Sequence, residues 1–245
     1  MKEKIKKIGG IIANAVYPPA CAVCGKPLGD DTGPPGLSGI HMRCFSHTIP
    51  LKGNLCGICG KSIGDDDIYC KDCNETQHTF DRSFAVYEIN SDMKDSLYRF
   101  KYQSKREYAE FYAKSIYEAH KNLLHFLQPE LLIPIPMYQR KERVRGYNQA
   151  ALIAGELGSL LDVPVNTDAL VRTKKTVPLK DCSFSERRKI MDGAFEVQET
   201  IYVKRVLVVD DIYTTGSTLD ACASVLKQAG VEKVYGVNVC IGAGV

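Results

Sequence analysis

The second half of the chain alternates short apolar runs with longer amphipathic stretches. Apolar runs at 131–135, 206–209 and 234–240 are typical of strands buried on both faces of a parallel sheet. Apolar residues recur at three- and four-residue spacing over 151–161 and 219–229, which predicts two helices packed on that sheet. Strands that alternate with helices in this way predict an α/β fold.

The first 78 residues follow a different pattern, in which cysteines stand where a core would need large apolar side chains. Seven of the ten cysteines fall between Cys21 and Cys73, and six of these seven form Cys-x2-Cys pairs. Beside an α/β domain, this density indicates metal binding rather than disulfides. We therefore expect a metal-binding module over 1–78 and an α/β domain over 79–245.

The cysteine pairs form two sets of four ligands, which predicts a double zinc ribbon with one or two structural zinc ions. A two-residue spacer lets both side chains of a knuckle face one ion, and two knuckles complete the closed tetrahedron of a structural site. One position is open, because either His41 or His47 can complete the first set. Taken in sequence order, the sets are Cys21, Cys24, His41 and Cys44, then Cys56, Cys59, Cys70 and Cys73.

The metal-binding module has too few large apolar residues to form a core by itself. Removal of zinc is therefore expected to unfold residues 20–75. In contrast, the loss of one zinc ion through Cys59→Ser is expected to leave the α/β domain and its ligand site intact.

A strand, an acidic pair and a hydroxyl-rich turn follow one another over 206–218. The unpaired amides and the positive dipole end of the helix after the turn bind phosphate. Asp210 and Asp211 would repel a phosphate unless a ligand lies between them. A ribose 5-phosphate fits, with its hydroxyls on the two acids and Mg²⁺ sharing the charge. The expected phosphate-binding residues are Thr214, Thr215, Gly216, Ser217 and Thr218.

Basic side chains gather at two further places in the α/β domain. Four follow the strand at 131–135, and we expect at least one to contact pyrophosphate or nucleic-acid phosphate, because arginine donates twice to phosphate oxygens. The alternative is a solvated turn. Residues 172–189 hold seven basic side chains and suit either a mobile lid or a disordered segment. The four basic residues after the strand are Arg140, Lys141, Arg143 and Arg145.

Nucleic-acid binding would need a local patch, because the net charge of +3 is spread evenly along the chain. Over 92–106, five basic residues alternate with Tyr98, Phe100 and Tyr102, a mixture that contacts single-stranded nucleic acid by charge and stacking. On a helix the same aromatic residues would face the core, so both interpretations stay open. No run approaches 18 apolar residues, so we expect no membrane span and a cytoplasmic protein.

The sequence VLVVDDIYTTGST at 206–218 resembles the signature that binds phosphoribosyl pyrophosphate (PRPP) in type I phosphoribosyltransferases. With RGYNQ at 145–149, SERR at 185–188 and the cysteine knuckles, nearly the whole chain resembles the ComF competence family. This resemblance implies a Rossmann-like parallel sheet with flanking helices, preceded by a zinc-binding module. It also implies a role in DNA uptake, with single-stranded DNA and a DNA-uptake helicase as possible partners.

Two functions remain open at this point. In the first, the protein is an enzyme that displaces magnesium-bound pyrophosphate from C1 of PRPP. Asp210 and Asp211 hold the ribose at the catalytic centre, and the basic segment stabilises the leaving group. In the second, the same scaffold grips a nucleotide or single-stranded DNA without catalysis. Residues 81–130 carry no recognisable motif that reads an acceptor base, and fold alone does not decide between the two.

Overall fold

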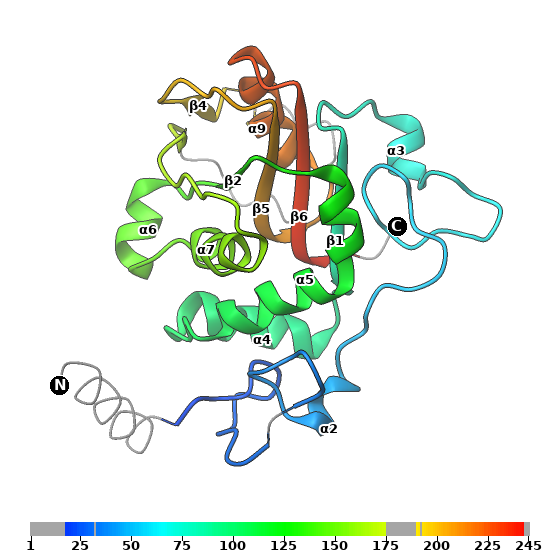
Figure 1. The fold of residues 1–245 in the computed structure, drawn as a ribbon, viewed down its shortest axis with the longest axis vertical. Coiled ribbons are helices and arrows are strands. Elements are labelled where there is room, and N and C mark those ends of the chain that lie inside the picture. The colour runs from blue at the N-terminus through cyan, green and yellow to red at the C-terminus, as the bar shows by residue number, and fades with distance from the viewer. Residues whose placement is uncertain (1–17, 32, 175–189, 192, 243–245) are drawn as a thin grey trace.

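A four-stranded parallel sheet lies at the centre of the computed structural model, which describes residues 18–31, 33–174, 190–191 and 193–242 (Figure 1). An isolated parallel bridge from Leu132 to Val165 continues the sheet beyond its last strand. The predicted parallel sheet is confirmed. In spatial order its strands are β1 (Arg82–Glu88), β6 (Lys233–Ile241), β5 (Arg205–Tyr213) and β2 (Leu131–Pro134).

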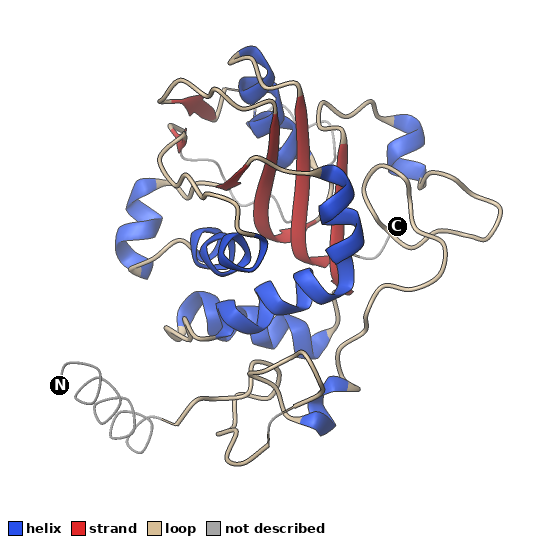
Figure 2. Cartoon of the chain, viewed as in Figure 1, coloured by secondary structure: helices blue, strands red, loops and turns tan. Residues whose placement is uncertain are grey.

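Helices cover both faces of the sheet (Figure 2). On one face α5 (Tyr108–Leu127) and α7 (Gln149–Leu161) pack against the strands and each other, while α9 (Ser217–Gln228) packs on the opposite face. The Asn148 side chain caps α7 by accepting from the Ala150 amide at 3.0 Å. The remaining elements are α4 (Ser91–Tyr102), α6 (Gln139–Arg145) and the antiparallel pair β3 (Leu170–Arg172) and β4 (Phe195–Val197).

Two boundaries differ from the sequence-based expectation. Strand β5 does not end at Val209 but continues to Tyr213, because Asp210, Ile212 and Tyr213 still pair with β6. The acidic pair therefore lies inside the strand. The basic segment after β2 is the helix α6, not a loop. Most of the segment expected to form a lid, residues 175–189, lies outside the described residues.

The part of the metal-binding module that carries the first ligand set, which we call the first cysteine module, packs on helices. It contains the short helix α2 (Met42–Phe45), and its apolar residues share a buried cluster with α4 and α5. The backbone carbonyls of Ala22 and Val23 accept hydrogen bonds from Ser96 and Arg99 of α4. The module is therefore anchored on the helical side of the domain and lies next to α4 (Figure 1).

The second module packs on the edge of the sheet. It contains α3 (Lys71–Glu75), and the carbonyl of Ile58 in its first knuckle accepts a 2.7 Å hydrogen bond from the Ser83 amide of β1. The segment between the two modules also runs antiparallel along β1, with Pro50 opposite Tyr87 and backbone hydrogen bonds of 2.9 Å on either side. Strand β1 is thus covered along its outer edge.

Candidate functional site

The structure brings the eight predicted metal ligands together as two separate groups. In each group every ligand atom lies within 4.8 Å of the others, and most of the side chains are buried. A compact set of four thiol or imidazole donors fits a closed structural zinc site and leaves no position for a reacting water. The groups are Cys21, Cys24, His41 and Cys44, then Cys56, Cys59, Cys70 and Cys73.

The two candidate histidines of the first group lie in different environments. His41 is buried, and its Nδ1 atom lies 3.4 Å from Cys24 Sγ and 3.7 Å from Cys44 Sγ. Its Nε2 donates to the Pro27 carbonyl at 3.0 Å, which leaves the Nδ1 lone pair directed at the thiols. In contrast, Nδ1 of the exposed His47 lies 3.0 Å from Asp92. The geometry therefore favours His41.

The turn between β5 and α9 is shaped as a phosphate cradle. Gly216 precedes the first turn of α9 with a φ of +78°, a left-handed conformation that glycine adopts without strain. Among the described residues no side chain caps this end of the helix, which leaves the amides of its first turn available to a ligand. The hydroxyls of Thr215 and Ser217 lie 3.0 Å apart beside it. We call residues 214–218 the phosphate loop.

The two aspartates lie next to this loop and differ in their partners. The Asp211 carboxylate forms an ion pair with Lys101 of α4, and both side chains are largely buried. Burial is the largest single influence on Lys101 and lowers its pKa, but the charge and hydrogen bond of Asp211 together with the charge of Asp210 outweigh burial and keep the pKa above its usual value. Asp210 accepts a 2.8 Å hydrogen bond from the Asp211 amide, and burial, followed by the charge of Asp211, raises its pKa to about 7. Asp210 is therefore close to half protonated at neutral pH, whereas the Asp211 carboxylate is paired with a cation.

A cleft of about 230 Å³ connects the acidic pair to the basic segment. Asp210, Asp211 and Thr218 are among the residues that line it. Two of the four predicted basic residues, Lys141 and Arg145, also line it, from successive turns of α6. The rest of the phosphate loop lines a smaller neighbouring pocket, which Thr218 and Asp210 share with the cleft. Carboxylates, cations and the phosphate loop therefore lie close together, the set of groups that a phosphorylated sugar with a second anionic group would require.

The other two predicted basic residues lie apart from the acidic pair. Arg140 lines an adjoining groove of about 620 Å³, whereas Arg143 lines neither the cleft nor this groove. This is the division expected for a helix, because Lys141 and Arg145 are four residues apart and share a face. In addition, the guanidinium of Arg145 lies 4.9 Å from the centre of the Tyr102 ring, which fixes the cation over an aromatic face.

Sequence analysis did not identify two cations of the cleft, Lys101 and Arg172. Arg172 belongs to β3 and lies with its guanidinium 5.5 Å from the centre of the Phe195 ring. A signal for Lys101 was present, because Leu97 and Phe100 on the buried face of α4 place residue 101 at the edge of that face. What the sequence does not give is the carboxylate that this lysine meets.

Comparisons with known proteins agree with this geometry. Residues 12–74 match the double zinc ribbon domain family, and residues 148–242 match the phosphoribosyl transferase domain family. Competence protein F of Haemophilus influenzae is 30% identical over 172 residues, which cover 68% of this chain and 75% of that protein. The chain belongs to the ComF competence family.

Other relatives of this ComF-family chain match over shorter stretches. Competence protein ComFC of Bacillus subtilis is 29% identical over 66% of the chain and 67% of its own length. DNA utilization protein YhgH of Escherichia coli O157:H7 is 31% identical over 43% of the chain and 47% of its own length. A purine phosphoribosyltransferase structure from Pyrococcus horikoshii overlaps 53% of the chain and 82% of its own, at 16% identity and a TM-score of 0.35.

The family assignment accounts for both cysteine groups and for the sheet with its phosphate loop. A double zinc ribbon followed by a phosphoribosyltransferase domain is the organisation that the two family matches give for this ComF-family chain, and the cysteine groups indicate structural zinc. None of the helices in the described ranges is long and apolar enough to cross a membrane.

Proposed function

We propose that this ComF-family protein binds PRPP, or a closely related phosphoribosyl ligand, at the carboxyl edge of its sheet and transfers the phosphoribosyl group to an acceptor. The observation that carries the proposal is the shared cleft, which the acidic pair and Thr218 line together with Lys141 and Arg145. A phosphate-binding turn alone would suit many nucleotides. Carboxylates between two groups of phosphate-binding residues suit a ribose with a phosphate at each end.

Each part of the cleft has a separate role in this proposal. The phosphate loop holds the 5-phosphate through amides and hydroxyls. Asp210 and Asp211 accept hydrogen bonds from the ribose hydroxyls and orient C1 toward the open side of the cleft. Lys141 and Arg145 bind the pyrophosphate and stabilise the charge that develops on it as the C1–O bond breaks. Arg172, which also lines the cleft, adds a further positive charge.

Magnesium fits this cleft as an ion carried by the ligand. Asp210 and Asp211 are the described carboxylates that line the cleft, and Mg²⁺ prefers oxygen donors. Bound there, the ion would neutralise the pyrophosphate and assist its departure. The Lys101–Asp211 ion pair leaves Asp210 as the acid with the weaker competing interaction, so we assign Asp210 the larger share of any contact with the ion.

The cellular role follows from the relatives, which are named for competence and DNA utilization. We infer a role in DNA uptake or use, with single-stranded DNA and a DNA-uptake helicase as partners. The cytoplasm is the compartment that suits the chain, because most of its cysteines are grouped as metal ligands, and metal-binding cysteines of this kind are typical of a reducing compartment.

A second function is supported by the groove next to the cleft. Lys101, Tyr102, Tyr138 and Arg140 are among the residues that line it, and the Tyr102 ring lies 5.0 Å from that of Tyr98. Both of these α4 tyrosines are more than half exposed, whereas Phe100 between them is buried. Exposed aromatic rings beside cations suit single-stranded nucleic acid. In this alternative the chain holds DNA as an adaptor and performs no transfer.

One experiment tests the proposal and separates the two functions. PRPP with MgCl₂ is titrated into the protein by calorimetry, pyrophosphate release is followed with candidate nitrogen acceptors, and a labelled oligonucleotide is titrated by anisotropy. PRPP binding with pyrophosphate release supports the transferase. PRPP binding without release, together with DNA binding that Tyr98→Ala/Tyr102→Ala weakens, supports the adaptor. If neither PRPP nor DNA binds, both functions are rejected.

A further inference from the structure

The second cysteine group lies directly beside the phosphate loop. Its four cysteines belong to the same buried cluster as Phe80, Tyr213 and Leu219, residues that flank the loop from three segments of the chain. The module is also held tightly on the sheet. Gly60 adopts a φ of +78°, and a Cβ atom there would lie 3.1 Å from the Cα atom of Phe84 in β1. The cysteine group and the loop therefore share one packed interior.

Tyr213 is one link between the two. It is the last residue of β5, its side chain is 4% exposed, and the edge of its ring packs on Phe80 with 6.3 Å between ring centres. Its hydroxyl lies 2.5 Å from the point where a Cβ atom on Gly216 would stand. The phosphate loop consequently rests on a tyrosine that the cysteine group helps to bury.

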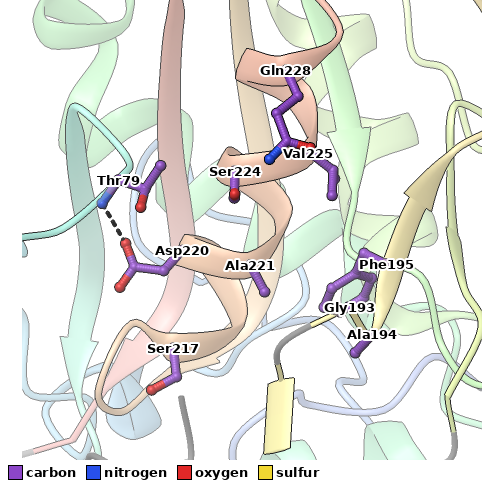
Figure 3. A pocket seen from close by; sticks show the side chains of 10 residues that line it. All are labelled: Thr79, Gly193, Ala194, Phe195, Ser217, Asp220, Ala221, Ser224, Val225 and Gln228. Carbon is purple, nitrogen blue, oxygen red and sulfur yellow. Dashed lines mark hydrogen bonds between the residues drawn. The ribbon is translucent and has the colours of Figure 1, made fainter. Parts of the chain in front are cut away.

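His78 is the second link and follows the last zinc-ligand cysteine of the module by five residues. Its Nδ1 atom lies 2.8 Å from Oδ2 of Asp220. The Thr79 amide donates to Oδ1 of the same carboxylate at 2.6 Å, as Figure 3 shows. Asp220 lies in the first turn of α9, one turn after Gly216. The His78 ring also stacks on Phe80 with 4.5 Å between centres. Both oxygens of one aspartate in the loop's own helix are thus held by the segment that leaves the second module.

The first cysteine group makes contacts of another kind. Its backbone carbonyls accept hydrogen bonds from Ser96 and Arg99 of α4. Gly39 packs on α5, where a Cβ atom added to Gly39 would lie 3.3 Å from the Cβ atom of Phe111. These contacts lie on the helical side of the domain. The effect of losing zinc can therefore be compared between the two cysteine groups of one protein, since both have four ligands and only the second group is packed against the phosphate loop.

We propose that the second zinc ribbon is part of the phosphate-binding site, in which His78 and Tyr213 act as positioning residues that hold the loop in its binding conformation. The zinc ion fixes the module, and the module fixes the loop through Tyr213 beneath Gly216 and through His78 on Asp220. This inference rests on the proposed function of the loop. It also revises the expectation that Cys59→Ser leaves the ligand site intact.

The first test compares the two metal groups. Cys59→Ser and Cys24→Ser are prepared in the full chain, zinc is counted, and each protein is titrated with ribose 5-phosphate. Both variants are expected to lose about one zinc ion, but Cys59→Ser is expected to weaken binding about tenfold more than Cys24→Ser. Equal affinities of the two variants, with one zinc ion lost from each, would overturn the proposal.

The second test keeps both zinc ions. His78→Ala is expected to weaken ribose 5-phosphate binding about tenfold, while His78→Asn, whose amide can still donate to Asp220, recovers most of the affinity. His125→Ala, at an exposed histidine of α5, is the matched control and is expected to bind normally. Wild-type affinity of His78→Ala would contradict the role of His78.

A third measurement does not depend on any ligand. Hydrogen exchange of the amides at 213–220 is expected to speed up at least about tenfold in Cys59→Ser and His78→Ala, and less in Cys24→Ser. If the wild-type protein binds no ribose 5-phosphate, the proposed function fails, and these exchange rates alone decide whether the ribbon supports the loop. Unchanged protection in both variants would reject that support.

Discussion

The phosphate loop and the cations of the ligand cleft are built in different ways. The phosphate loop is one continuous segment whose geometry comes from the backbone of a strand, a left-handed glycine and the start of a helix. The cations are Lys101 from α4, Lys141 and Arg145 from α6 and Arg172 from β3, segments that lie far apart in the sequence. The loop is set by local structure and the group of cations by tertiary packing.

This difference predicts unequal sensitivity to substitution. A change in the loop alters the backbone amides that bind the phosphate oxygens, and no neighbouring group can take the place of these amides. A change among the cations removes one of several charges, and the rest still attract the ligand. The following predictions test this contrast in order of decreasing effect.

Gly216→Ala is expected to have the largest effect, about a hundredfold loss of ribose 5-phosphate affinity. The left-handed backbone costs alanine about 1–2 kcal/mol, and overlap with the Tyr213 hydroxyl adds about 1–3 kcal/mol. Calorimetry measures the loss. Gly155→Ala on α7, where an added Cβ meets nothing within 4 Å, is the control. An equal loss in both variants would show that the effect is not specific to the loop.

Asp211→Ala is expected to weaken PRPP binding about thirtyfold, because hydrogen bonds to charged groups contribute about 1.5–3 kcal/mol. It should also lower the melting temperature, since Lys101 loses its partner in a largely buried place. The double variant Asp211→Ala/Lys101→Met is expected to regain stability without regaining PRPP affinity. Recovery of both properties together would mean that Asp211 acts on the fold alone.

The affinity for magnesium-bound PRPP is expected to rise about tenfold between pH 6 and pH 8. Asp210 has a pKa near 7 in the free protein, so the fraction of its carboxylate that is ionised rises over this interval. A positively charged ion binds the ionised form, which gives the increase its sign. Asp210→Asn removes the titrating group, and its residual pH dependence reports the ligand phosphates alone. An identical pH profile in this variant would exclude Asp210 as the source.

Arg145→Ala is expected to have the smallest effect, a loss of about threefold to fivefold in pyrophosphate affinity. The difference between the variant and the wild-type protein is expected to become smaller in high salt, because salt screens exposed charges. Arg143→Ala is the matched control, because it removes the same charge from the same helix without touching the cleft. Competition against labelled PRPP measures both. If the two variants behave alike, the net charge of α6 matters and the position of Arg145 does not.

The loop and the cysteine groups could be predicted because their chemistry is written in short stretches of sequence. A Cys-x2-Cys spacing already brings two ligands to one ion, and the turn at 214–218 already places amides at a helix start. Even there the strand end was misjudged, because pairing with β6 extends β5 by four residues beyond Val209. Local pattern predicts the type of element, whereas neighbours decide where it ends.

The basic side of the cleft was predictable only in part. The charges of α6 were evident from the sequence, but the helix that separates Lys141 and Arg145 from Arg143 was not predicted. The alternating pattern over 92–106 also fitted two interpretations, a surface that contacts nucleic acid and a helix whose aromatic residues face the core. Phe100 is buried in the core while Tyr98 and Tyr102 are exposed, and Lys101 between them reaches the acidic pair. Tertiary contact, absent from local pattern, decides each of these cases.

The extended segment around Pro50 gives the metal-binding module a second role, which is to cover the outer edge of the sheet. An open outer strand of a sheet offers unpaired amides and carbonyls to any other chain, and such edges promote aggregation. Here residues 49–51 and the knuckle carbonyl of Ile58 occupy that edge of β1, and a proline stands at the centre of the added segment. A chain that began at residue 79 would lose this cover, so the phosphoribosyltransferase domain expressed alone should self-associate at concentrations where the full chain stays dispersed.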